Sequence, residues 1–408
     1  MLVAAASLLA ASFITACETL TVDFVYVLCA KAAGANNYGE IDVFEINSES
    51  GRMRQIPTSP FPSSGRDPVA EAVSSDKQDL FVVNQDDNTI VEFLIGNDGK
   101  LYPFNTVNTP GIFPMAVAAN KSNLFVLDTY EPLPLCSNAD PCPGSIAVYS
   151  LTGSTSTCTA TVCIGSPATN PAVNGTYWPL TLPGANSNDV IVPTALTVLA
   201  SGSEVYVSAY DSSVTPNVGY IFGFSVGSGG VLNPLNGGVP HDMGIGSNGL
   251  GIRPSAIVSD ASGTYVYVTD STNGIVVGYS VASGVLTKIG DTATGNNPSA
   301  IVLDPTYPYA YVANSQDATV TAYSTSNGAL SPIGSYATGL QPVAIGIDPS
   351  TNHFLYTANF LSNTVSGFEL SRTEGTLLNS QFTPYPTNAQ PVAVAAIPHN
   401  GTGAGITQ

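Results

Sequence analysis

A phrase of four short β-type runs recurs along this chain from near its N-terminus to its C-terminus. One copy reads Pro298-Ser-Ala-Ile-Val-Leu-Asp304, Tyr309-Ala-Tyr-Val-Ala-Asn314, Ala318-Thr-Val-Thr-Ala-Tyr323 and Gly328-Ala-Leu330. Val, Ile, Tyr, Phe and Thr between clusters of Asn, Asp, Gly and Pro are what strands and hairpin turns require. The repetition therefore predicts stacked or radial four-stranded units rather than one irregular domain.

The number of repeated units follows from seven prolines, each of which stands at the start of an apolar run. They are Pro68, Pro114, Pro193, Pro254, Pro298, Pro342 and Pro391. The intervals between them, by subtraction, are 46, 79, 61, 44, 44 and 49 residues, so two units carry insertions.

The two ends of the chain complete one unit between them. Residues 24–28 and 41–46 resemble a second and a third strand, and residues 391–396 resemble a first strand with nothing after it. Six continuous units and this shared one predict an all-β fold, a seven-bladed β-propeller of four-stranded antiparallel blades closed by pairing of the terminal strands. Such closure leaves only short protected edges. A linear β-solenoid is the competing fold, but the two ends of a solenoid do not complete one unit together.

Composition and length limit the partners and the domain organisation that we expect. The chain has 408 residues, 10 Lys plus Arg against 29 Asp plus Glu, and a net charge of -19. This acidity argues against nucleic acid and anionic membrane surfaces as partners. The unbroken repeat predicts one monomeric domain over residues 21–400, with an insertion at 129–190 and a flexible tail at 401–408. After residue 16 we find no apolar run of the roughly 20 residues that a membrane span needs.

The N-terminus resembles an export signal. Residues 2–13 form an apolar segment, and Ile14-Thr-Ala-Cys17 after it resembles the lipobox of bacterial lipoproteins. We expect residues 1–17 to be a signal peptide, Cys17 to carry the lipid, and the protein to lie outside the cytoplasm, in the cell envelope, periplasm or outer surface. No Lys or Arg precedes the apolar run, so an ordinary signal peptide and a buried N-terminal element stay open alternatives.

Cysteine usage supports export. Four cysteines fall in the long insertion, namely Cys136, Cys142, Cys158 and Cys163. They predict two disulfides that brace a loop with little core of its own. The pairs Cys136–Cys142 and Cys158–Cys163 are the most local, although the other two pairings stay open. Zinc fits poorly, because the spacings are six and five and no histidine is near. We expect Cys29 to be a buried free thiol.

The prolines also locate a candidate binding face. In an antiparallel blade, the loop that enters the first strand and the loop that joins the second strand to the third emerge on the same side. We expect this side to gather loop residues from all blades. Its predicted ligand-binding residues are Asp67, Asn84, Asp242, Asp270, Asn314 and Asn359, although the Asn and Asp residues that end second strands also suit turn capping.

Three residues on this face could carry chemistry. Arg66 and Arg253 could hold a carboxylate or phosphate, and His241 could act as a general base near neutral pH. The alternatives are exposed ion pairs for the arginines, with Asp67 or Asp242, and a solvated histidine. We expect no metal site and no cofactor, because no recognised catalytic or phosphate-binding pattern occurs.

Several phrases together resemble the repeats of the lactonase-like seven-bladed propellers with Tyr-Val-Thr-Asn repeats, the group that includes bacterial 6-phosphogluconolactonase. These phrases are Tyr311-Val-Ala-Asn314, Asp317-Ala-Thr-Val-Thr-Ala-Tyr323, Gly328-Ala-Leu-Ser-Pro-Ile333 and Pro342-Val-Ala-Ile. The resemblance covers nearly the whole chain after residue 23. It implies a lactonase fold and, in enzymatic members, His, Arg and acidic residues on the propeller face.

The sequence and the resemblance together predict two possible functions. The first is a non-catalytic, lipid-anchored scaffold of the cell envelope that binds a protein, glycan or small molecule through its loop-rich face. The alternative is a lactone hydrolase, in which Arg253 and Arg66 hold the substrate and His241 delivers water. The sequence favours the scaffold, because few histidines and arginines are available to receive a phosphosugar.

Overall fold

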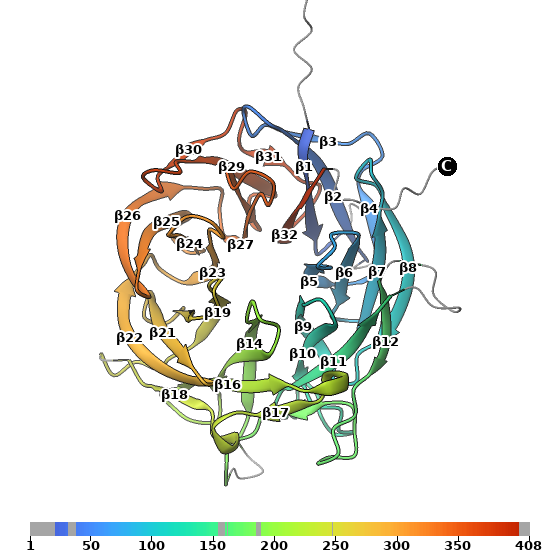
Figure 1. Ribbon diagram of the computed structural model, residues 1–408, viewed down its shortest axis with the longest axis vertical. Coiled ribbons are helices and arrows are strands. Elements are labelled where there is room, and N and C mark those ends of the chain that lie inside the picture. The colour runs from blue at the N-terminus through green and yellow to red at the C-terminus, as the bar shows by residue number, and fades with distance from the viewer. Residues whose placement is uncertain are drawn as a thin grey trace, which may run out of the picture.

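The computed structural model describes residues 21–31, 38–153, 160, 162–184, 189–246 and 248–399. Its strands form seven antiparallel sheets arranged as the blades of one ring (Figure 1). The predicted seven-bladed propeller is confirmed. We number the blades 1 to 7 in the order of their first strands, so blade 7 contains both ends of the chain. No helix in the described part is long and apolar enough to cross a membrane.

The first strand of each blade lies innermost and contacts the first strands of both neighbouring blades. The first strands are β5 (Pro68–Val73), β9 (Ile112–Ala119), β14 (Ile191–Val198), β19 (Pro254–Ser259), β23 (Pro298–Leu303), β27 (Pro342–Ile347) and β32 (Pro391–Pro398). Each starts at or just before one of the seven prolines. Proline suits this position, because a donor at the start of an inner strand has no ladder partner.

Second and third strands form the buried middle of each blade. The second strands are β1 (Thr21–Cys29), β6 (Asp79–Asn84), β10 (Asn123–Tyr130), β15 (Glu204–Asp211), β20 (Tyr265–Asp270), β24 (Tyr309–Asn314) and β28 (Phe354–Asn359). The third strands are β2 (Tyr38–Asn47), β7 (Thr89–Ile95), β11 (Ser145–Thr152), β16 (Val218–Val226), β21 (Ile275–Ala282), β25 (Thr319–Ser326) and β29 (Thr364–Leu370). Their aromatic and β-branched side chains fill the space between blades.

Fourth strands are the least regular part of the propeller. Three are continuous, namely β8 (Leu101–Asn108), β22 (Val285–Ala293) and β26 (Ala329–Ala337). The other four are split into two pieces, namely β3 (Met53–Gln55) with β4 (Phe61–Arg66), β12 (Cys163–Pro167) with β13 (Trp178–Pro179), β17 (Leu232–Pro234) with β18 (His241–Gly244), and β30 (Leu377–Asn379) with β31 (Tyr385–Pro386). Two short 3₁₀ turns, η1 (Ser228–Gly230) and η2 (Asn236–Gly238), flank β17.

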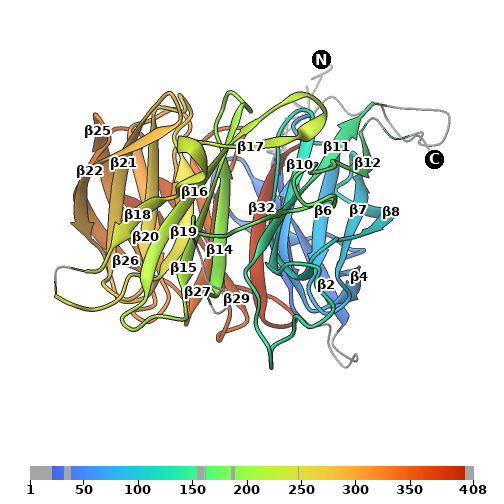
Figure 2. The same ribbon diagram turned by 90° about the horizontal axis from the view of Figure 1, so that it is seen from below.

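The ring closes as the two ends predict. Strand β1 pairs with β32 over the register Asp23↔Pro398 to Cys29↔Pro391, and with β2 on its other side. Figure 2 shows the blades from the side, with strands crossing the thickness of the ring.

A tyrosine and a glycine of the repeated phrase join neighbouring blades. The hydroxyl of Tyr26 donates to the carbonyl of Gly99, that of Tyr311 to Gly375 and that of Tyr356 to Gly51, at 3.0, 3.3 and 3.1 Å. Each glycine lies in a turn between a third and a fourth strand with a positive φ. The repeat therefore encodes contacts between blades as well as strands.

Candidate functional site

One face of the propeller is built from the two predicted sets of loops, which are bonded to each other in the same way in five of the seven blades. A backbone N–H that follows the second strand donates to the carbonyl of the residue before the proline. These bonds are Gln85 to Asp67, Ser271 to Arg253, Ser315 to Asn297, Phe360 to Gln341 and Ala30 to Gln390, at 2.9 to 3.0 Å. We call this side the loop face.

The seven residues that precede the prolines form what we call the inner rim of the loop face, since the strands they begin surround the axis (Figure 1). In blade order they are Asp67, Phe113, Val192, Arg253, Asn297, Gln341 and Gln390. Going around the ring from Arg253, three neutral amides follow in blades 5, 6 and 7, and Asp67 comes next. The rim is therefore a polar arc between one cation and one carboxylate, completed by two apolar residues.

Backbone strain marks this rim. Asp67, Phe113, Asn297 and Gln341 have φ of +48°, +55°, +52° and +55°. The left-handed region is unfavourable for Phe and Gln, and residues held there concentrate at functional sites. Four of seven equivalent positions share this geometry, so the loops present their rim side chains in a fixed way.

Arg253 is the cation of the rim. Its guanidinium lies over the ring of Tyr210 at 4.6 Å from the centroid, and Nη2 donates to the Tyr210 hydroxyl at 2.7 Å. Its backbone N–H donates to Asp270 Oδ1 at 3.1 Å. Within the described residues no carboxylate forms an ion pair with Arg253. The remaining N–H groups can therefore meet an acceptor from outside.

Asp67 is the carboxylate of the rim. Burial, together with nearby Asp86, raises its pKa above the ordinary value, and Lys31 opposes that rise. A raised pKa makes a carboxylate a stronger base than a free one. From the sequence, Asp67 was predicted as a ligand-binding residue and as a possible ion-pair partner of an arginine, and the three amides received no role, although all four stand at the same position before a proline.

Arg66 is paired with the carboxylate of Asp87. Its side chain forms an ion pair with Asp87, with Nη2 2.5 Å from Oδ1, and its backbone N–H donates to the same carboxylate. The prediction named Asp67 or Asp242 as the exposed partner. Asp87 takes that place because it lies in the β6–β7 turn, which meets the end of β4.

His241 lies apart from both arginines. It belongs to the outer strand β18, opposite Ile221 of β16, and its ring packs edge-on against Tyr279 at 4.9 Å. Burial lowers its pKa, against the smaller effect of Asp242. No described contact joins His241 to Arg66 or Arg253, so the three predicted catalytic residues do not form one cluster. Asp242 is exposed and accepts a hydrogen bond from the Gly244 N–H at 2.7 Å.

The predicted polar residues that end second strands are internal. Asn84, Asp270, Asn314 and Asn359 have no exposed surface. Asn314 Oδ1 accepts from the Gly295 N–H, for example, and Asp270 holds Arg253 as described above. These side chains support the loop face, as turn capping predicts, and ligands would meet the rim residues that they position.

Cysteines brace one loop of this face. Cys136 and Cys142 form the predicted disulfide in the loop between β10 and β11. Tyr130, at the start of that loop, packs edge-on against Phe113 of the rim at 6.1 Å. Cys163 is disulfide-bonded, whereas Cys158 and Cys17 lie outside the described residues. Cys29 is a buried free thiol, as predicted.

Metal chemistry has no obvious location in the described part of the chain. No group of three or more His, Cys, Asp or Glu side chains there is arranged to hold a metal ion.

Comparison with known proteins agrees with this architecture. The chain has a seven-bladed propeller fold. The model of the family described as "Lactonase, 7-bladed beta-propeller" matches residues 246–347, which confirms the resemblance that the repeats predict. None of the curated proteins matches the chain in sequence.

Solved structures with the same fold include two whose descriptions name lactonases. The periplasmic gluconolactonase PpgL of Pseudomonas aeruginosa has a TM-score of 0.68 at 16% identity, over 92% of this chain and 99% of that chain. A Bacteroides fragilis protein, provisionally described as a 6-phosphogluconolactonase, has a TM-score of 0.64 at 19% identity, over 93% and 99%. Identities this low show the shared fold alone.

Proposed function

We propose that this protein hydrolyses a lactone of a polyhydroxylated acid at the inner rim of the loop face. The sequence analysis favoured a non-catalytic scaffold, but the family match and the gluconolactonase among the similar structures support the alternative. The observation that carries the proposal is the rim itself. Asp67, three amides and Arg253 follow one another around the ring, next to strained backbone.

The chemistry assigned to the rim is hydrolysis of a cyclic ester. Asp67 takes a proton from water while the water oxygen bonds to the lactone carbonyl carbon. The ring C–O bond then breaks, and the released oxygen takes the proton that Asp67 holds, which gives the open hydroxy acid and restores the Asp67 carboxylate. We assign the side chains of Asn297, Gln341 and Gln390 to the binding of substrate hydroxyl groups. Arg253, across the rim from Asp67, binds an oxygen at the far end of the substrate.

The test is turnover of gluconolactone and its 6-phosphorylated form, measured against spontaneous hydrolysis. We expect Asp67→Asn to lower kcat by about 10²–10⁴-fold, the usual contribution of a general base. Arg253→Gln should mainly raise KM, since it removes binding rather than proton transfer. Arg66→Gln, which removes the ion pair with Asp87 and the hydrogen bond to the Asp86 carbonyl, is the matched control and should stay near wild type.

Two results would contradict this assignment. Turnover lost in His241→Gln but kept in Asp67→Asn would support the residues predicted from sequence instead of the rim. Absence of turnover on all lactones, phosphorylated or not, would return the binding role to first place.

We also propose that the protein is exported and carries a lipid on Cys17. The Cys136–Cys142 disulfide supports export, because disulfides persist in oxidising compartments. Radiolabelled palmitate should enter the wild-type protein and not the Cys17→Ala variant. Equal labelling of the two would contradict the anchor.

A further inference from the structure

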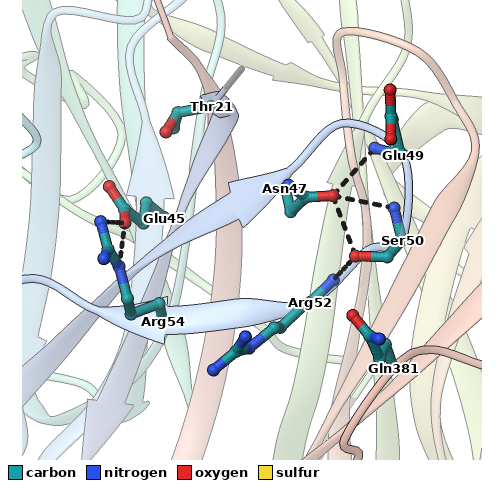
Figure 3. A pocket seen from close by; sticks show the side chains of 8 residues that line it. All are labelled: Thr21, Glu45, Asn47, Glu49, Ser50, Arg52, Arg54 and Gln381. Atoms are coloured by element: carbon teal, nitrogen blue, oxygen red, sulfur yellow. Dashed lines mark hydrogen bonds and ion pairs between the residues drawn. The ribbon is translucent and has the colours of Figure 1, made fainter. Parts of the chain in front are cut away.

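A polar cavity of about 420 Å³ lies beside the β2–β3 hairpin of blade 7 (Figure 3). This hairpin joins a third strand to a fourth, so it emerges on the side opposite the loop face. Every residue that lines the cavity has a polar side chain, namely Thr21, Glu45, Asn47, Glu49, Ser50, Arg52, Arg54 and Gln381. Its volume is in the range of small-molecule sites.

The repeat does not account for the two arginines. Arg52 and Arg54 stand one and three residues after the hairpin glycine. The first of these positions holds Lys100, Val231, Val285, Ala329 and Thr376 in other blades, and the second holds Tyr102, Asn233, Thr287, Ser331 and Leu378. Blade 7 alone has a cation at both positions, and the fold does not require them. They are two of only ten Lys and Arg in the chain.

The two arginines are held differently. Arg54 forms hydrogen bonds and an ion pair with Glu45 through Nε and Nη2. Arg52 has no such carboxylate among the described residues. Its guanidinium lies over the Phe382 ring at 4.8 Å from the centroid. Stacking of this kind leaves the N–H edge of the guanidinium free to bind an acceptor in its plane.

Phe382 is itself unusual. Its side chain is 67% exposed, and its φ is +66°. A bulky residue in the left-handed region is a strained outlier, and such strain gathers at ligand sites. An exposed aromatic ring in a strained conformation, with the Arg52 guanidinium over it, therefore points to a ligand site beside Arg52.

The hairpin that carries Arg52 is held by hydrogen bonds within itself and to the neighbouring blade. Asn47 Oδ1 accepts hydrogen bonds from the Glu49 N–H, the Ser50 N–H and the Ser50 hydroxyl, at 3.1, 3.0 and 2.9 Å (Figure 3). The next residue, Gly51, is bonded through its carbonyl to Tyr356 of blade 6. A fixed frame lowers the entropy that binding costs.

We propose that this cavity binds a small hydroxylated carboxylate, with Arg52 as the bidentate ligand of the carboxylate group. Glu49 and Gln381 also line the cavity, with Gln381 beside Arg52, and suit the hydroxyl groups of the same molecule (Figure 3). The nearby Glu45 and Glu49 disfavour polyanions. This site lies on the opposite side from the inner rim and does not depend on the proposed lactonase activity.

The test is calorimetric titration of gluconate and, separately, inorganic phosphate, because an arginine fork can receive either group. We expect gluconate to bind the wild type and Arg52→Gln to weaken binding by about tenfold or more, as loss of a charged hydrogen bond does. Arg372→Gln is the matched control, since it removes the same charge from an exposed arginine that donates to the Thr351 carbonyl. It should change binding by less than about twofold, and Phe382→Leu should weaken it.

Arg253→Gln separates this site from the inner rim, and gluconate binding at the cavity should survive it. The proposal is overturned if Arg253→Gln abolishes binding while Arg52→Gln does not, if phosphate binds through Arg52 and gluconate does not, or if neither probe binds. Circular dichroism and melting curves of each variant keep a folding defect from being read as a binding defect.

Discussion

At the scale of single residues, the turn glycines show how closely the blades pack. Gly51 has a φ of +61°, and a Cβ there would lie 2.4 Å from a ring atom of Phe354 in the next blade. Gly51→Ala should therefore combine a left-handed cost of roughly 1–2 kcal/mol with overpacking of roughly 1–3 kcal/mol. Gly229→Ala is the matched control, because its φ is +68° and the space around it is open. Chemical denaturation that gives equal losses for both would contradict this view of the turn.

Glu71 is the residue that most clearly breaks the core pattern. It stands three residues after Pro68, where the other six blades have Val117, Leu196, Ile257, Ile301, Ile345 and Val394. Both carboxylate oxygens are buried without a partner in the protein, and burial raises the pKa of Glu71 well above its ordinary value. Glu71→Val should increase the free energy of unfolding by about 1–3 kcal/mol near pH 8.

The sign of this effect depends on pH. Because the native carboxyl holds a proton that the unfolded chain loses above about pH 4.5, wild-type stability falls as the pH rises from there. The advantage of Glu71→Val should consequently be larger at pH 8 than at pH 5 in urea denaturation. An advantage of the same size at both values would show that the carboxyl is not protonated in the native state.

At the scale of the element, the β1–β32 pair closes the ring. The central residues of β1, Val25, Tyr26, Val27 and Leu28, have no exposed surface. A chain that ends at Gln390 would lack β32 and leave one edge of β1 unpaired, and such edges promote aggregation. We expect this chain to form oligomers or aggregates in gel filtration. A chain that ends at His399 keeps every described strand and should remain monomeric. A monomeric short chain with an unchanged melting temperature would contradict the role of β32.

The first, second and third strands of each blade could be predicted from the sequence, whereas the form of the fourth strands could not. First, second and third strands repeat because each must fit between two neighbouring blades, so their residues carry the period. Fourth strands face solvent, and nothing in the repeat reveals that four of them are split. The same reason limits the site prediction. The pre-proline position of Arg253 fixed its face correctly, whereas the Arg66–Asp87 pair and the place of His241 on β18 depend on loop paths that have no period.

At the scale of the whole molecule, the candidate functional residues lie at positions where the sequence departs from the repeat. The repeat supplies a rigid ring, and its exceptions carry the candidate functions: the rim residues on one side and Arg52 with Arg54 on the other. A ring of this kind has no need of internal charge for its packing. It nevertheless buries several carboxylates, so we expect its stability to depend on pH.

Asp23, Asp79 and Asp128 are the clearest of these carboxylates, since burial raises the pKa of each from 3.8 to about 8. The native state retains protons that the unfolded chain releases, so the free energy of unfolding should decrease as pH rises from about 4 to 8. Even one pKa unit for each of the three groups would amount to about 4 kcal/mol. Urea denaturation at pH 5, 6, 7 and 8 measures the trend. Greater stability at pH 8 than at pH 5 would mean that these carboxylates are ionised and stabilised inside the ring.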